Sequence, residues 1–180
     1  MFKFGFIFFL LSFNYSFSIS NTVIPKNLEE KLDKVLIEYF NGFYDIKEPI
    51  NLSKEALQES KLNHADDLIF RIKDKKSNSI GYAYLGKAKS KVALFDYVVI
   101  FDKNLIITQV KVLIYREDHG GEIASKRWLK QFLGFEKNQN IIYKKDIAGI
   151  SGATISAASL TNSVNNVLKT MDILYQLKQL

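Results

Sequence analysis

The sequence predicts an α+β fold, in which an antiparallel sheet packs with N-terminal helices and a C-terminal helix. Toward both ends of the chain, in residues 27–41 and 154–175, apolar residues recur at steps of three and four, as on one face of an α-helix. Between residues 68 and 115 the pattern changes to segments rich in Val, Ile, Tyr and Phe, separated by polar turns. Helices that pack their apolar faces on one antiparallel sheet bury a layered hydrophobic core, as in α+β proteins.

The first residues of the chain have the pattern of a secretory signal peptide. Lys3 supplies a positive charge, residues 4–13 form an almost unbroken apolar run, and small residues follow at 16–20. An uncleaved membrane anchor is the alternative, but the apolar run is shorter than the ~20 residues of a spanning helix. We therefore expect a signal peptide at 1–20 and an exported protein, periplasmic or otherwise extracytoplasmic. An uncleaved segment would leave it membrane-associated.

Residues 21–67 are expected to form a helical N-terminal part. A first helix is predicted over 27–41, where acidic residues occupy the first turn and Leu32 and Leu36 lie on the apolar face. A second, shorter helix is predicted over 53–62. The polar stretch 63–67 closes this part.

A second part, the domain at 68–180, is expected to begin with two β-hairpins. The second hairpin has the stronger pattern, because Asp102 and Asn104 in its turn tolerate left-handed backbone geometry. Both of its strands are rich in β-branched and aromatic residues, as a central sheet requires. The four predicted strands are 68–73, 79–85, 93–101 and 105–115.

The chain is expected to return to helix after this sheet. A helix is predicted over 123–132, ending near Gly134, and a short edge strand over 138–143. The terminal helix follows a Ser-Gly-Ala-Thr turn, and one apolar stripe defines it. The stripe comprises Leu160, Val164, Val167, Leu168, Met171, Leu174 and Tyr175.

Composition excludes several classes of function. The chain has no cysteine, which rules out disulfides, thiolate metal sites, a cysteine nucleophile and lipid attachment through cysteine. Its net charge of +6 is spread over dispersed lysines and arginines, as on a solvated surface. A basic recognition helix is missing, so we expect no nucleic acid partner. Attraction to anionic lipid or to an acidic redox partner remains open.

The Ser-Gly-Ala-Thr turn at 151–154 is the most informative local pattern. It places Thr154 at the N-cap or in the first turn of the terminal helix, where backbone N–H groups lack partners and the helix dipole is positive. Such a helix end attracts phosphate. Gly152 allows close approach of a ligand and a positive φ. The alternative is that Thr154 is an ordinary helix cap, as threonine often is.

The stretch 146–156 resembles the flavinylation motif of the FMN-binding domain family, which includes the flavin subunits of sodium-pumping and Rnf-type electron-transport complexes. The resemblance covers roughly residues 80–174 in the expected order. Many members carry an acidic residue at or near the position of Ala148, where this chain offers only Asp146. The other segments that resemble the family are Gly81-Tyr82-Ala83, residues 115–123, Trp128, Gln131-Phe132 and Gly134.

This resemblance implies that FMN is bound covalently, through a phosphoester on Thr154 that makes the chain a phosphoprotein. A flavin transferase would attach the FMN outside the cytoplasm. The resemblance further implies redox partner proteins, which could belong to a membrane electron-transport complex. The implied cofactor-binding residues are Thr154 itself, Ser151, Gly152 and Ala153 in its turn, and Glu117 and Gly121 in the pocket.

Other candidate sites are weaker. His64 lies beside Asp66 and Asp67, but one histidine with loop carboxylates is more typical of a solvated loop than of a metal site. His119 lies in the segment that resembles the flavin-facing turn. The sequence fits equally well with a position of His119 near the flavin ring and with a plain surface role. We therefore predict no metal site and no catalytic residue.

These patterns favour an exported electron-transfer module, since no pair of residues suggests the acid–base chemistry of a dedicated reductase. Two alternatives stay open. One is a small extracytoplasmic FMN-dependent reductase with a substrate pocket over the ring. The other is a flavin-free binding module that keeps only the fold.

Overall fold

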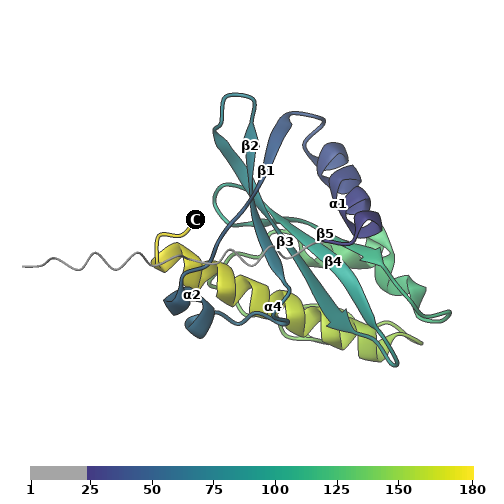
Figure 1. Ribbon diagram of the computed structural model, residues 1–180. Coiled ribbons are helices and arrows are strands. Elements are labelled where there is room, and N and C mark those ends of the chain that lie inside the picture. Colours follow the sequence, from purple (N-terminus) through teal and green to yellow (C-terminus); the bar gives the residue numbers. More distant parts are fainter. Residues whose placement is uncertain (1–23) are drawn as a thin grey trace, which may run out of the picture.

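The computed structural model describes residues 24–180, which form a five-stranded antiparallel sheet covered by helices on both faces (Figure 1). The strands follow one another across the sheet in chain order, so each pairs with its sequence neighbour. They are β1 (Tyr44–Pro49), β2 (Leu68–Asp74), β3 (Ser79–Lys89), β4 (Leu94–Phe101) and β5 (Ile107–Ile114). The α+β prediction is confirmed, and the predicted signal peptide at 1–20 lies outside the described residues.

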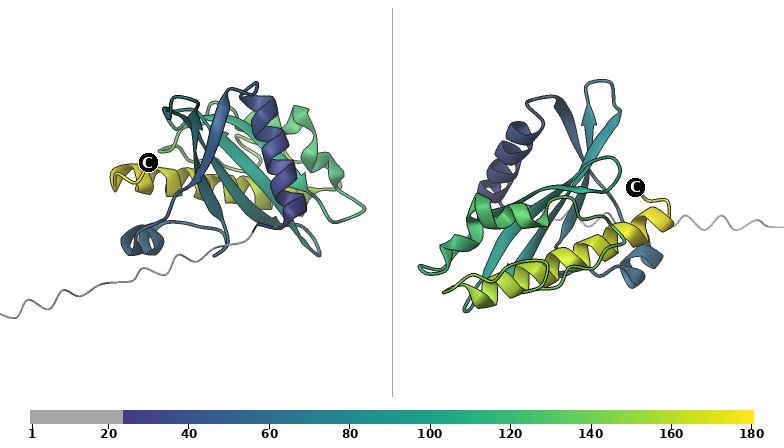
Figure 2. Two further views of the ribbon diagram at one scale, coloured as in Figure 1. Left: turned by 45° about the horizontal axis from the view of Figure 1, so that its top comes forward. Right: turned by 180° about the vertical axis from the view of Figure 1, so that it is seen from behind.

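Two helices lie across opposite faces of the sheet (Figure 2). On one face, α1 (Lys26–Tyr39) buries Leu32 and Leu36 against sheet residues that include Ile72 and Ile100. On the other face, α4 (Thr154–Gln176) buries its apolar stripe from Leu160 to Leu174 against a cluster that includes Phe95. Tyr175, which was predicted on the same stripe, is instead 54% exposed. β4 is buried on both faces, because its successive side chains alternate between the two clusters.

Shorter helices complete the layer that contains α4. α2 (Lys54–Glu59) packs against α4, and its cap Ser53 accepts a hydrogen bond from the Ala56 N–H. The predicted helix over 123–132 is interrupted. It consists of a 3₁₀ turn, η1 (Gly121–Ala124), a single helical turn, α3 (Lys126–Leu129), and a second 3₁₀ turn, η2 (Lys130–Phe132).

One local prediction was wrong, and one strand was not predicted. No strand forms over 138–143, where the backbone makes only one isolated bridge, between Tyr143 and Ile147. Conversely, β1 was not expected, because it is largely polar. Its polar side chains find partners across the fold: Lys47 binds Asp33 of α1 at 2.6 Å, and Glu48 binds Lys73 of β2 at 2.8 Å.

The division at residue 67 into two parts stays a prediction, although β1 and α1 both pack on the sheet that the second part contributes. In the described part of the chain, no helix is both long and apolar enough to cross a membrane.

Candidate functional site

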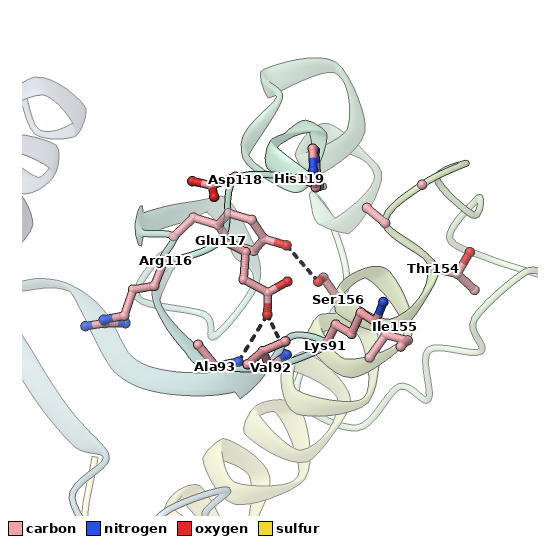
Figure 3. Close-up of a pocket in the computed structure, with 13 residues that line it drawn as sticks. Lys91, Val92, Ala93, Arg116, Glu117, Asp118, His119, Thr154, Ile155 and Ser156 are labelled. Atoms are coloured by element: carbon pink, nitrogen blue, oxygen red, sulfur yellow. Dashed lines mark hydrogen bonds between the residues drawn. The ribbon is translucent and has the colours of Figure 1, made fainter.

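A cavity of about 670 Å³ lies where the turn between β3 and β4, the chain that follows β5, and the start of α4 meet (Figure 3). These segments are distant in sequence, and the sheet brings them together because β3, β4 and β5 are adjacent strands. The residues that line the cavity are Lys91, Val92, Ala93, Tyr115, Arg116, Glu117, Asp118, His119, Gly152, Ala153, Thr154, Ile155 and Ser156.

The start of α4 presents an accessible hydroxyl. Thr154 is the first residue of the helix and is exposed, and its Oγ1 donates only a long hydrogen bond of 3.4 Å to the Ile150 carbonyl. The N–H groups of Thr154, Ile155 and Ser156 donate no hydrogen bond to any residue of 24–180, and no side chain caps this helix end. Free N–H groups and the helix dipole together favour a phosphate here.

Glu117 lines the wall of the cavity that is formed by the chain after β5. Its carboxylate Oε1 accepts hydrogen bonds from the N–H groups of Val92 and Ala93, at 2.6 and 3.1 Å, and from the Ser90 hydroxyl. The pKa of Glu117 is lowered, first by the Ser90 hydroxyl and then by the Val92 N–H, because both bind the charged form. Glu117 therefore lines the cavity, and it also binds the turn between β3 and β4.

Close packing joins the segment after β5 to α4. The Tyr115 hydroxyl lies 3.1 Å from the Ser156 hydroxyl. A Cβ atom at Gly120 would lie 2.9 Å from Tyr115 Oη and 3.3 Å from Ala153 Cβ, and the φ of Gly120 is +83°. Both the positive φ and the lack of room require glycine at this position.

The predicted site residues are not all equivalent. Thr154, Gly152, Ala153 and Glu117 line the cavity. Ser151 is exposed in the turn but is not part of the cavity wall, and Gly121 has open space around its Cβ position. Gly120, its neighbour, makes the close contacts instead.

The loop that precedes the Ser-Gly-Ala-Thr turn is tied to the α3 segment. The Trp128 indole N–H donates to the Ala148 carbonyl at 2.7 Å, and the Ala148 N–H donates to Gln131 Oε1 at 2.8 Å. Ala148 is exposed and is held through its backbone. Trp128 is thus a buried packing residue whose polar atom also positions the motif.

The turn at residues 90–93 is part of the site that sequence reasoning missed. It carries no motif, and only its contact with Glu117 reveals its role. Arg116 was also missed. Its guanidinium donates to the buried Asp96 carboxylate at 2.5 Å and to the Leu94 carbonyl at 2.8 Å, so it anchors the start of β4.

The two histidines lie in different places. His119 lines the cavity, whereas His64 donates its backbone N–H to Asp67 in a loop outside the cavity wall. Among residues 24–180, no cluster of three or more metal-ligating side chains occurs.

The donor set of the cavity fits FMN. The start of α4 offers a hydroxyl that can be esterified and N–H groups that suit a phosphate. Val92, which is 85% exposed, and Ile155, which is 51% exposed, offer apolar surface at the cavity for a flat ring. The cavity volume falls within the range of about 300–1,000 Å³ that is usual for ligand and cofactor sites.

The sequence model of the FMN-binding domain family matches residues 95–169. The matched part begins in β4, contains Glu117 and the whole Ser-Gly-Ala-Thr turn, and ends within α4. No curated protein matches the chain. Residues 95–169 therefore match the FMN-binding domain family, as the resemblance of the sequence indicated, and this match supports FMN as the cofactor of that region.

Proposed function

We propose that the protein is an exported flavoprotein in which FMN is joined to Thr154 by a phosphoester bond and which transfers electrons between partner proteins. The observation that carries this proposal is the position of Thr154. Thr154 is the exposed first residue of α4, whose first-turn N–H groups are free within residues 24–180, and it is one of the residues that line a cavity of about 670 Å³. The apolar N-terminus, which fits a signal peptide, supports export.

Attachment would proceed by phosphoryl transfer. The Thr154 Oγ1–H bond breaks and an Oγ1–P bond forms, while the leaving group of an activated FMN donor departs with the proton. A flavin transferase would supply both the donor and the catalysis. The chain then gains the mass of FMN less one water.

The residues of the site have distinct tasks in this proposal. The first-turn N–H groups of α4 bind phosphate oxygens, and Gly152, with φ of +81°, lets the chain turn into the helix. Glu117 keeps the turn at 90–93 in place, so that Val92 is available to the ring together with Ile155 of α4. When bound, FMN supplies the one- and two-electron redox chemistry, and the protein sets its orientation and solvent access.

Covalent attachment of the cofactor suits an electron carrier that works outside the cytoplasm. FMN that dissociated there could not readily be replaced, so a bond that prevents dissociation preserves function. A cavity that is open to solvent also lets a partner approach the cofactor. Redox partners, including a membrane electron-transport complex, follow from this role.

Co-expression with a flavin transferase, followed by intact-mass measurement of the denatured protein, tests the attachment. We expect wild type and Ser151→Ala to gain the mass of FMN less one water and to fluoresce as flavin after denaturation. Thr154→Ala should remain unmodified. Ser151→Ala is the matched control, because it removes the other exposed hydroxyl of the same turn. An unmodified wild type, or a modified Thr154→Ala chain, contradicts the proposal.

Reduction of the flavinylated protein tests the electron-transfer role. We expect a reductant to reduce the flavin and a protein acceptor to reoxidise it, with little steady-state turnover of small organic acceptors. Rapid turnover of such acceptors by the purified protein alone would instead identify a reductase.

A further inference from the structure

The outer edge of β5 is unpaired along most of its length. β5 is the last strand of the sheet, and beyond Ile107 its backbone makes no hydrogen bond to a described residue other than those of its ladder with β4. Only Ile107 is covered: its N–H donates to the Phe135 carbonyl and its carbonyl accepts from the Gly134 N–H, both at 2.8 Å. An edge of this kind can accept another extended chain.

A basic groove of about 270 Å³ runs beside this edge, between β5 and the α3–η2 segment. Val110 and Leu129 are buried at its apolar wall, and Leu133 is 42% exposed. No acidic residue lines the groove. Its charged residues are Lys111 on β5 and, one helical turn apart, Lys126 and Lys130.

These three lysines have no ion-pair partner within residues 24–180, and none donates a side-chain hydrogen bond there. Unpaired lysines also occur elsewhere in residues 24–180, as at Lys31, Lys34 and Lys75, but here three of them line one groove that has no acidic residue in its wall. The groove therefore combines unpaired backbone groups, apolar surface and uncompensated positive charge in one place.

We propose that the β5 edge binds an extended acidic segment of a partner protein. Such a segment would add a sixth strand to the sheet, with its backbone on β5 and its carboxylates on Lys111, Lys126 and Lys130. A second copy of this chain fits less well, because its own β5 edge would bring a second set of the same three lysines to an already basic groove. The inference rests on the groove and stands apart from the proposed FMN site at the start of α4.

The position of the groove suits a redox partner. β5 runs from the groove directly into Tyr115 and Glu117, which line the cavity at the start of α4. A partner held along β5 would thus lie on the strand that leads to the cofactor site.

Fluorescence anisotropy with a labelled, acetylated peptide of alternating glutamate and valine tests the proposal on the purified protein. Two further peptides serve as probes of the binding mode: one has lysine in place of glutamate, and the other is N-methylated at alternate residues so that it cannot pair as a strand. We expect only the unmodified acidic peptide to bind, with an affinity that falls as salt is added. Amide exchange at residues 108–114 should slow when it binds.

Two triple variants with the same loss of charge locate the site. Lys111→Gln/Lys126→Gln/Lys130→Gln should weaken binding about tenfold or more, the combined effect of three exposed ion pairs. Lys31→Gln/Lys34→Gln/Lys75→Gln, which changes exposed lysines away from the groove, should bind as wild type does. The proposal is overturned if the acidic peptide does not bind, which would leave the lysines as guards against edge aggregation. Equal binding of the N-methylated peptide, or equal weakening in both triple variants, overturns it as well.

Discussion

The Glu117 carboxylate accepts a hydrogen bond from the Val92 N–H at 2.6 Å, which connects two walls of the cavity across 25 positions of sequence. Val92 is otherwise among the most exposed apolar residues of the fold, in a turn with no apolar anchor of its own. The turn between β3 and β4 is thus held by its own hydrogen bond from the Ser90 N–H to the Ala93 carbonyl, at 2.8 Å, and by one carboxylate from the chain that follows β5. Cavity shape depends on that link.

Glu117→Gln should loosen the turn at residues 90–93. Glutamine offers a neutral oxygen in place of a carboxylate, so the bonds from Val92 and Ala93 weaken. Hydrogen exchange of these two amides should be several-fold faster than in wild type, as measured by NMR or mass spectrometry. The control is Asp118→Asn, which changes the neighbouring exposed carboxylate and should leave both amides unchanged. Unaltered exchange in Glu117→Gln would show that the turn holds itself.

The same link predicts a pH dependence. The pKa of Glu117 lies below its ordinary value of 4.5, so the folded state favours the charged form. Its stabilising effect is therefore fully present above pH 4.5 and is lost as the pH falls through the lower folded value. The difference in Val92 amide exchange between wild type and Glu117→Gln should follow this course. A difference that grew on acidification would contradict it.

The elements that could be predicted from sequence are those whose determinants are local. The stripe of α4 needs only its own periodicity, and the turn between β4 and β5 is fixed by Asp102, whose carboxylate accepts from the N–H groups of Asn104 and Ile106. β1 could not be predicted in this way. Its stability depends on β2 and on pairs such as Lys47 with Asp33, which no local pattern encodes.

The residues of the site also divide into those with a local sequence motif and those that depend on distant contacts. Thr154 could be found because its motif is contiguous, whereas the turn at 90–93 joins the site only through Glu117. Sequence reasoning placed a pocket glycine at Gly121, but two adjacent glycines look alike until their backbone angles are known. Gly120 is the one with a positive φ.

Tyr84→Phe should destabilise the fold. The Tyr84 hydroxyl donates to the Asp67 carboxylate at 2.5 Å, and burial raises the pKa of Asp67. Removing this donor leaves a buried carboxylate with one partner fewer, which costs about 1–3 kcal/mol. Urea unfolding measures the loss. Tyr82→Phe is the matched control on the same strand, since the Tyr82 hydroxyl binds no residue of the described chain, and an equal loss in both variants would refute the assignment.

Gly120→Ala should be destabilising and should also impair the site. The new Cβ would lie 2.9 Å from Tyr115 Oη, and the residue would keep a φ of +83° that alanine rarely adopts. We expect a loss of about 1–3 kcal/mol in the free energy of unfolding. Because relief of the clash moves Tyr115 away from Ser156, less of the protein should become flavinylated by a transferase.

Gly121→Ala separates this effect from a general loss of backbone freedom. No atom lies within 4 Å of its Cβ position, and its φ is outside the left-handed region. Its unfolding free energy should therefore change by less than about 0.5 kcal/mol, as for ordinary surface substitutions. Flavinylation of Gly121→Ala should match that of wild type. The reverse order, with Gly121→Ala the more damaging variant, would mean that the cofactor contacts Gly121 and that the packing of Gly120 on α4 does not shape the cavity.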